Sequence, residues 1–300
     1  MRGSRRGSLL IITLWIVTIL GALSVAVARY LSTEVRLTRY RLARQEAREL
    51  ARSGVYLAMS LIQQDSTSTP VVDWNAEPWA VPQTVSPVPG QQLTVTITDE
   101  ERKLNVNTAT SEQVAYILGD AALAQAIVDY VDAPDPSEDR LRDDPPYYAK
   151  NSPITVLEEL SDVPDMDAVR YQTLVSTATP FTVPTVPGGP LNINTAVPEV
   201  LEAVGLSPTT VQTIIQYRSG PEHFLETGTA LITLLENQGL VLDDAQRTVL
   251  ASGLFTVASQ TFTVVAEGLV EPSAVRVRIQ AVFQRSAGSP APQIIAWREG

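Results

Sequence analysis

The sequence contains no cysteine and a single histidine. The first absence excludes disulfide bonds, thiolate zinc sites and cysteine nucleophiles. The histidine, His223, stands in a Pro-Glu-His-Phe context, where a packed or solvent-facing ring is the simplest interpretation. The sequence has no glycine-rich phosphate loop, no His-Glu-x-x-His motif and no Gly-x-Ser-x-Gly motif, and nothing singles out a pair of carboxylates for hydrolysis. The sequence therefore predicts a protein that is not an enzyme.

Basic residues are scarce beyond residue 52. The first 52 residues hold ten Arg and three Glu, whereas the rest of the chain holds 12 basic and 30 acidic residues. The net charge of the whole chain is -11. An acidic body is a poor partner for nucleic acid, because phosphate contacts need clustered Lys and Arg.

A run without any charged residue extends from Ser8 to Ala28. As a helix, its 21 residues reach about 30 Å, which is the thickness of a hydrocarbon core. The preceding MRGSRRG carries three Arg, which hold that end in the cytoplasm and place the rest of the chain across the membrane. A cleaved signal peptide is disfavoured, because the run is long and is followed by Arg29, Arg36 and further Arg residues. A plain single-span anchor fits the hydropathy as well.

The same helix is predicted to continue to about Ile62. No proline interrupts Ser8–Gln64, and small or apolar residues recur at three-and-four spacing in its second half. These residues are Ala43, Ala47, Leu50, Ala51, Gly54, Val55, Leu57, Ala58, Leu61 and Ile62. Because the stripe is rich in Ala and Gly, we expect it to lie on a sheet and not to form a coiled coil.

The rest of the chain predicts a sheet that is interrupted by helices. After an irregular, Pro-rich connection over Asp65–Gln92, the segment Leu93–Asp99 alternates like a strand. After a last helix over Asp243–Ser252, four more strands are predicted at Leu254–Val257, Thr261–Gly268, Ala274–Gln284 and Gln293–Trp297. The predicted fold class is therefore α+β, with a long N-terminal helix packed on a mainly antiparallel sheet and a large helical insertion.

The helical insertion contains an internal repeat. LNVNTA at Leu104–Ala109 recurs as LNINTA at Leu191–Ala196, 87 residues later, and Glu112 matches Glu199 at the same offset. In each copy the Asn-Thr pair lies where it could cap a helix. A piece related to these units, with a helix over Ser152–Leu160, is predicted between them. The match indicates a duplicated helical unit.

The two units resemble helix-hairpin-helix modules, which are SAM-like, and in which a Gly-x-Gly hairpin binds phosphate. The corresponding hairpins here read Leu118-Gly119-Asp120 and Gly205-Leu206-Ser207. Residues 104–226 hold 18 acidic against five basic residues, and such walls repel a phosphodiester chain. We therefore expect no nucleic-acid partner, and interpret the units as a protein-interaction head built on the same scaffold.

The short basic leader that ends in Gly7, directly before the apolar helix, resembles the N-terminus of type IV pilins and type II secretion pseudopilins. In that family a prepilin peptidase cuts after the glycine and the new N-terminus is methylated. The resemblance implies cleavage between Gly7 and Ser8 and N-methylation of Ser8. Most members carry Glu at the fifth mature position, where this chain has Ile12. The missing Glu is typical of the K-type minor pseudopilin. A subunit without this Glu is a poor repeating unit of a filament, but it can lie at the end of one.

A set of motifs in the middle of the chain resembles the K-type pseudopilin in order and spacing. They are VVDWNAEPWA at Val71–Ala80, LNVNTA, DYVDAPDP at Asp129–Pro136 and DDPPYYAKNSPITVLEELSDVPDM at Asp143–Met166. The resemblance implies a pilin-like sheet interrupted by a large, mostly helical insertion. It also implies a protein that joins the I- and J-type minor pseudopilins at the filament tip, with other pseudopilins and the prepilin peptidase as further partners.

An acidic run follows the first repeat on a predicted loop. Calcium prefers six to eight oxygen ligands from such loops, and K-type heads can bind calcium in this neighbourhood. The spacing is not that of an EF-hand, and most acidic runs are solvated surfaces. If calcium binds, the predicted ligands are Asp132, Asp135 and Asp139.

The sequence thus predicts a minor pseudopilin of the type II secretion system, at the tip of the periplasmic pseudopilus, which helps to initiate assembly and export of folded proteins across the outer membrane. The expected location is the inner membrane, as a single-pass protein with a cytoplasmic N-terminus and a periplasmic head. A type IV pilus minor pilin and a membrane-tethered DNA-binding protein remain alternatives. The expected divisions are a leader (1–7), a filament-core helix (8–28), the remaining helix with the linker and first strand (29–103), the helical insertion (104–252) and the C-terminal strands (253–300).

Overall fold

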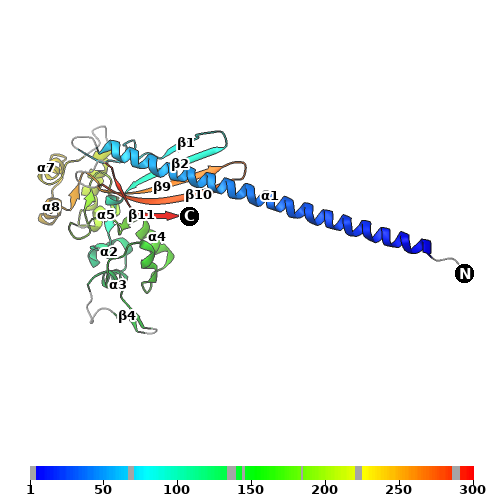
Figure 1. Ribbon diagram of the computed structural model, residues 1–300. Coiled ribbons are helices and arrows are strands. Elements are labelled where there is room, and N and C mark those ends of the chain that lie inside the picture. Colours follow the sequence, from blue (N-terminus) through cyan, green and yellow to red (C-terminus); the bar gives the residue numbers. More distant parts are fainter. Residues whose placement is uncertain are drawn as a thin grey trace.

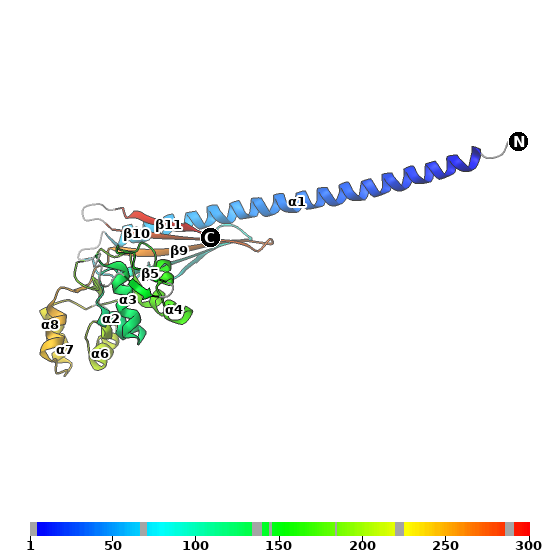
Figure 2. The ribbon, with the colours of Figure 1, turned by 90° about the horizontal axis from the view of Figure 1, so that it is seen from below.

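A computed structural model describes residues 5–66, 71–133, 140–143, 146–183, 185–219, 225–285 and 291–300. One long helix, α1 (Arg5–Asp65), extends far beyond the rest of the molecule and lies with its second half across a five-stranded sheet (Figure 1). The other helices are gathered at the end of the sheet that is farthest from the N-terminus (Figures 1 and 2). The predicted α+β class is confirmed.

Helix α1 has 61 residues and is therefore about 90 Å long. Its first half is exposed through Leu42, whereas the predicted small-residue stripe of its second half is buried. The stripe residues with no exposed surface are Ala47, Ala51, Val55, Ala58 and Ile62. Small side chains allow the helix to lie close to the strands, so the Ala- and Gly-rich stripe forms a helix–sheet contact, as the sequence predicted.

The sheet is antiparallel throughout, in the order β1-β2-β9-β10-β11. The strands are β1 (Gln83–Val85), β2 (Gln91–Asp99), β9 (Thr261–Val270), β10 (Val275–Gln284) and β11 (Gln293–Glu299). Alternate side chains of β2, β9 and β10 are buried against α1, which is the period of a sheet with one covered face. Strand β1 lies inside the connection that the sequence predicted to be irregular.

Gly268 of β9 lies directly beneath the backbone of α1. A Cβ at this position would lie 2.2 Å from the Ala47 carbonyl oxygen and 3.0 Å from the Ala51 nitrogen. On the helix side, a Cβ at Gly54 would lie 2.7 Å from Leu93 Cδ1. Both glycines are therefore required by the close approach of helix and sheet.

The insertion consists of two units of similar build. The first contains β3 (Leu104–Asn105), α2 (Ser111–Leu118), α3 (Ala121–Val131), β4 (Arg140–Asp143), β5 (Pro146–Tyr148), a 3-10 helix (Leu157–Asp162), α4 (Ala168–Thr177) and β6 (Ala178–Thr179). The second contains β7 (Leu191–Asn192), α5 (Pro198–Ala203), α6 (Pro208–Arg218), α7 (Thr229–Asn237), α8 (Asp244–Ala251) and β8 (Phe255–Thr256). In each unit the first and last strands pair in parallel and close the unit on itself.

The repeated asparagines make the same contacts in both units. Asn107 Nδ2 donates to the Ile154 carbonyl and Asn107 Oδ1 accepts from the Ile154 N–H, at 3.0 and 2.8 Å. Asn194 makes the equivalent pair with Leu225, at 3.5 and 2.6 Å. These asparagines hold remote loops and do not cap helices, since α2 is capped by Thr110 and α5 begins at a proline.

The end of the second unit corrects one predicted strand. Leu254–Val257 was expected to join the sheet, but the strand at Phe255–Thr256 pairs with Leu191–Asn192. The insertion therefore extends beyond residue 252. The helix predicted over Ser152–Leu160 is also wrong in kind, because only a 3-10 helix forms there.

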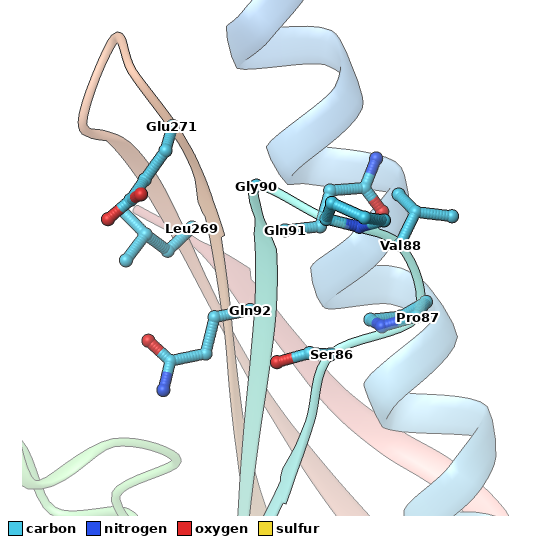
Figure 3. Close-up of a pocket in the computed structure, with 9 residues that line it drawn as sticks. Ser86, Pro87, Val88, Gly90, Gln91, Gln92, Leu269 and Glu271 are labelled. Carbon is cyan, nitrogen blue, oxygen red and sulfur yellow. The ribbon is translucent and has the colours of Figure 1, made fainter.

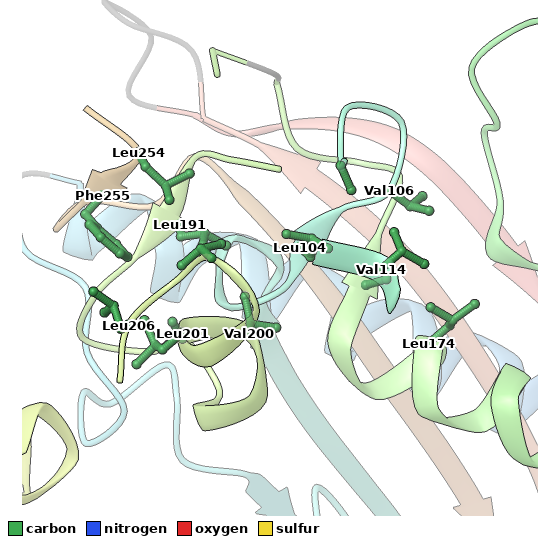
Figure 4. Packing of buried hydrophobic residues seen from close by; sticks show 14 of the residues in the cluster. Leu104, Val106, Val114, Leu174, Leu191, Val200, Leu201, Leu206, Leu254 and Phe255 are labelled. Carbon is green, nitrogen blue, oxygen red and sulfur yellow. The ribbon is translucent and has the colours of Figure 1, made fainter. Parts of the chain in front are cut away.

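The two units share one hydrophobic core. Leu104 and Leu191, at the same position of the two repeats, are fully buried members of this core (Figure 4). Val114 and Leu174 of the first unit and Leu201 of the second belong to the same cluster. The duplication thus buries the apolar side of each unit against the other.

Candidate functional site

The exposed half of α1 is the largest apolar surface of the described chain. Leu9, Leu10 and Trp15 are 64%, 70% and 65% exposed, and every residue from Leu9 to Leu42 is exposed. Among the described residues, α1 is the one helix long and apolar enough to cross a membrane. An apolar surface of this size needs a membrane or sister helices to cover it. The structure thus agrees with the predicted single membrane anchor.

Ile12, the position where most pilins carry Glu, is 51% exposed on this surface. Gly7 and Ser8 lie in the first turns of the same helix. Cleavage between them and methylation of Ser8 stay predictions.

A cluster of buried charge, which we call the acidic junction, connects the sheet to the insertion. Its members are Asp65, Asp73, Glu77, Asp99, Glu101 and Arg285. Asp65 ends α1, Asp99 ends β2 and Glu101 lies just after it, and Arg285 follows β10. Charged residues are seldom buried without partners, so each group needs an explanation from its contacts.

Arg285 neutralises two of these carboxylates. Its Nη1 donates to both Asp73 carboxylate oxygens, at 2.9 and 2.8 Å, and its Nη2 forms an ion pair with Asp65. The guanidinium lies 4.7 Å from the centre of the Phe262 ring, and Trp79 packs edge-on against the same ring. The arginine therefore fixes the end of α1 and the segment around Asp73 to the sheet.

Asp99 is hydrogen-bonded to the second unit of the insertion. Its Oδ2 accepts from Thr195 Oγ1 at 2.5 Å, from Ser259 Oγ at 2.6 Å and from Asn192 Nδ2 at 3.2 Å. Thr195 and Asn192 belong to the second LNINTA motif, and Ser259 follows β8. This carboxylate thus holds the insertion on the end of β2.

Burial raises the pKa of most carboxyls in the junction. Desolvation is the largest cause for Asp73, Glu77 and Glu101, whose pKa values rise to about 7, about 8 and about 9. Desolvation also raises the pKa of Asp99, against the hydrogen bonds from Ser259 and Thr195. Glu77 and Glu101, whose pKa values lie above 7, therefore hold protons at neutral pH, mainly because burial disfavours their charged forms.

A cation does not fit the junction. Oxygens of Asp65, Asp73 and Glu77 lie within 4.8 Å of one another. The Arg285 guanidinium already binds two of these carboxylates, and Glu77 accepts from Trp74 N and Trp79 Nε1 at 3.0 and 2.8 Å. The place of a metal ion is therefore taken by fixed donors.

Of the three predicted calcium ligands, only Asp132 lies among the described residues. Asp132 is exposed at the C-terminal end of α3, where its backbone N–H donates to the Val128 carbonyl. Asp135 and Asp139 lie outside the described residues, as does His223. The calcium site stays a prediction.

The predicted hairpins do not present free backbone N–H groups to phosphate. At the start of α3 the Asp120 carboxylate accepts from the N–H groups of Ala122 and Leu123, both at 3.1 Å, and forms an ion pair with Arg170. A carboxylate thus occupies the position that a phosphate would take.

Two hollows of the described surface lie away from the charged groups of the acidic junction. One lies between the connection Ser86–Gln92 and the end of β9, with Leu269 and Glu271 on its other side (Figure 3). Another, of about 280 Å³, lies between the sheet and the insertion and is crossed by an ion pair between Arg298 and Glu158.

The fold defines a class of protein. A helix that spans a membrane with one half and covers an antiparallel sheet with the other is the pilin-like architecture, here with a duplicated helical insertion between β2 and β9. The prediction of a pilin-like fold is confirmed.

Comparison with known proteins specifies the class. The chain is 25% identical to type II secretion system protein K of Pectobacterium carotovorum subsp. carotovorum, over 88% of each chain. Its fold is similar to a chain in the crystal structure of the GspK–GspI–GspJ complex from the type 2 secretion system of enterotoxigenic Escherichia coli. That match has a TM-score of 0.61 at 20% identity and covers 88% of this chain and 99% of the other. No protein-family model matches the chain. The resemblance to K-type pseudopilins is thus confirmed.

Sequence reasoning missed the acidic junction. The WNAEPW segment was linked to the K-type family. The residue before it, Asp73, was not expected to lie near Asp99 and Arg285, which are 26 and 212 positions further along the chain. The one available signal was the acidic run Asp99-Glu100-Glu101 directly after a buried strand.

Proposed function

We propose that this chain is a minor pseudopilin of a type II secretion system and acts by assembly, at the tip of a periplasmic filament. The observation that carries the proposal is α1, which is bare and apolar over its first half and lacks a carboxylate at Ile12. A helix of this kind packs among sister helices, but it cannot offer a carboxylate to a neighbouring N-terminus.

The position of the insertion supports a place at the tip. The two helical units are stacked beyond and beside the end of the sheet that is farthest from the membrane helix (Figures 1 and 2). The acidic junction holds the second unit there through the hydrogen bonds of Asp99 to Asn192 and Thr195. In a filament whose axis follows α1, this mass would obstruct another subunit above it.

The partners follow from the similar proteins. A solved structure with a similar fold is that of the GspK–GspI–GspJ complex. We infer that I- and J-type minor pseudopilins bind this chain. The expected arrangement is a cytoplasmic N-terminus, one crossing of the inner membrane and a periplasmic head.

Processing of the N-terminus tests this proposal. The full chain is expressed with and without a prepilin peptidase, and its intact mass is measured after purification from the membrane. We expect loss of residues 1–7 and addition of one methyl group at Ser8 only when the peptidase is present. A Gly7→Leu variant is the control and should keep its full length. A chain that keeps Met1 in the presence of an active peptidase, while a known pseudopilin in the same cells is cut, would contradict the proposal.

A further inference from the structure

A bare segment of α1 separates the apolar run from the head. Residues 29–42 are all exposed, and Ala43 is the first residue that the head covers. We call residues 29–44 the neck. Residues 29–42 are open to solvent or to a membrane surface, although Arg41 lines a shallow hollow together with Glu299 and Gly300 of the head.

The neck is strongly cationic. It holds one acidic residue, Glu34, and five arginines, which are Arg29, Arg36, Arg39, Arg41 and Arg44. Within the residues that the structure describes, none of these arginines forms an ion pair. The arginines that follow do form ion pairs, Arg48 with Glu299 and Arg52 with Glu49. The positive charge of the neck is therefore available to a partner.

The neck begins where the apolar run ends. Arg29 directly follows Ala28, and at 1.5 Å per residue Arg36 lies about 11 Å further out. The headgroup layer adds roughly 5–8 Å on each side of the hydrocarbon core, and a surface potential extends about 8–10 Å beyond it. Arginine stems also bend toward the headgroups. Arg29 and Arg36 thus lie within reach of lipid headgroups, with Tyr30, 66% exposed, at the interface itself.

The head has the opposite charge. Residues beyond position 52 hold 30 acidic against 12 basic residues. An anionic membrane therefore repels the head and attracts the neck, so the neck is the part of the chain suited to face such a surface.

We propose that the neck binds anionic lipid headgroups on the side of the membrane where the head lies. This inference rests on α1 crossing a membrane, and not on a role in secretion. The contact holds the first turns of the neck in the headgroup layer and opposes withdrawal of the helix from the bilayer. Its strength depends on the fraction of anionic lipid and on salt.

A spin label on the neck tests the proposal. The chain has no cysteine, so a Ser32→Cys variant of the full chain takes one label between Arg29 and Arg36. The labelled protein is reconstituted into vesicles of phosphatidylcholine, with or without phosphatidylglycerol. We expect a water-soluble relaxation agent to reach the label several-fold less often in the anionic vesicles, and this protection to disappear at high salt.

Two double variants decide whether the neck arginines cause the protection. Arg29→Gln with Arg36→Gln should abolish it. Arg276→Gln with Arg278→Gln removes the same charge from the exposed face of β10 and should leave it unchanged. A label at Ser24→Cys should be inaccessible in both kinds of vesicle, because it lies inside the membrane.

Three results would overturn the proposal. The label could be equally accessible in both vesicles, or the Ser24→Cys label could be accessible, which would mean that the neck does not lie at a membrane surface. Protection could also depend on the protein-to-lipid ratio and not on anionic lipid. The neck would then bind the acidic head of another copy.

Discussion

The geometry around Gly268 requires a glycine, because the carbonyl of Ala47 lies where a side chain would begin. Both atoms nearest to a Cβ at this position belong to the backbone of α1, so no side chain can rotate to make room. The contact between helix and sheet therefore depends on the absence of one methyl group.

We predict that Gly268→Ala lowers the free energy of unfolding of the head by about 2–3 kcal/mol, the upper part of the range for overpacked cores. Chemical denaturation of the full chain in detergent measures the change. Gly21→Ala is the matched control, since no atom lies within 4 Å of a Cβ there. Equal stabilities of the two variants would contradict the close approach.

The carboxyls of the acidic junction predict how stability depends on pH. Asp73, Glu77 and Glu101 have raised pKa values of about 7, about 8 and about 9, mainly through desolvation. A carboxyl whose pKa is higher in the folded than in the unfolded state stabilises the fold below its unfolded pKa. That stability is lost as the pH rises through the folded pKa. The melting temperature should therefore fall as the pH is raised from 5 to 9.

A Glu101→Gln variant separates this effect from other titrations. Glutamine keeps the oxygen that accepts from Gln260 N but does not ionise, so the fall between pH 7 and 9 should become shallower. A difference of 1 kcal/mol corresponds to a shift of about 2–4 °C in a protein of this size. Glu199→Gln on the exposed side of α5 should leave the slope unchanged. A melting temperature that rises with pH over this range would contradict the raised pKa values.

At the scale of elements, the duplication places an asparagine with the same hydrogen bonds in each of the two units. Asn107 and Asn194 each pair with both backbone groups of a distant residue, Ile154 in the first unit and Leu225 in the second. Both distant residues are buried, so a missing asparagine leaves their backbone groups unpaired.

We predict that Asn107→Ala and Asn194→Ala each lower the free energy of unfolding by about 1–3 kcal/mol. The loss should be larger for Asn194, which is fully buried, than for the half-buried Asn107. Thermal and chemical unfolding of each variant measure the change, with Asn237→Ala at the exposed end of α7 as the control. If only one of the two asparagine variants lost stability, the roles of Asn107 and Asn194 would not be equivalent.

The loop with the predicted calcium ligands Asp132, Asp135 and Asp139 leads to another prediction about a single element. If it binds calcium, the ion should raise the melting temperature of the full chain, removal by a chelator should reverse the rise, and Asp132→Asn should reduce it. Asp162→Asn, on an exposed turn, is the control. A melting temperature that does not respond to calcium would remove this site from the account.

Much of the architecture could be predicted from local pattern. The apolar run, the Ala- and Gly-rich stripe and the alternation of Ala274–Gln284 each follow from the period of one element. Strand β8 could not be predicted correctly, because a two-residue strand has no period and only its partner at Leu191–Asn192 determines where it pairs. The acidic junction was missed for the same reason, since Asp73 and Arg285 are 212 residues apart.

At the scale of the whole molecule, three parts differ in surface chemistry along one axis. The apolar half of α1 is followed by the cationic neck, and then by an acidic head whose insertion lies farthest from the N-terminus (Figure 1). This order suits a subunit that is anchored by its helix and presents its head to other proteins. The sequence predicted the order, whereas only the structure shows that Asp99 attaches the insertion to the sheet and that Arg285 fixes the end of α1 to it.

Co-purification with the I- and J-type pseudopilins tests the central claim most directly. The full chain, tagged at its C-terminus, is expressed with both proteins and purified from the membrane in mild detergent. We predict that this chain and the I- and J-type pseudopilins elute as one complex of all three chains. The same two proteins forming a complex with each other while this chain elutes alone, correctly folded, would contradict it.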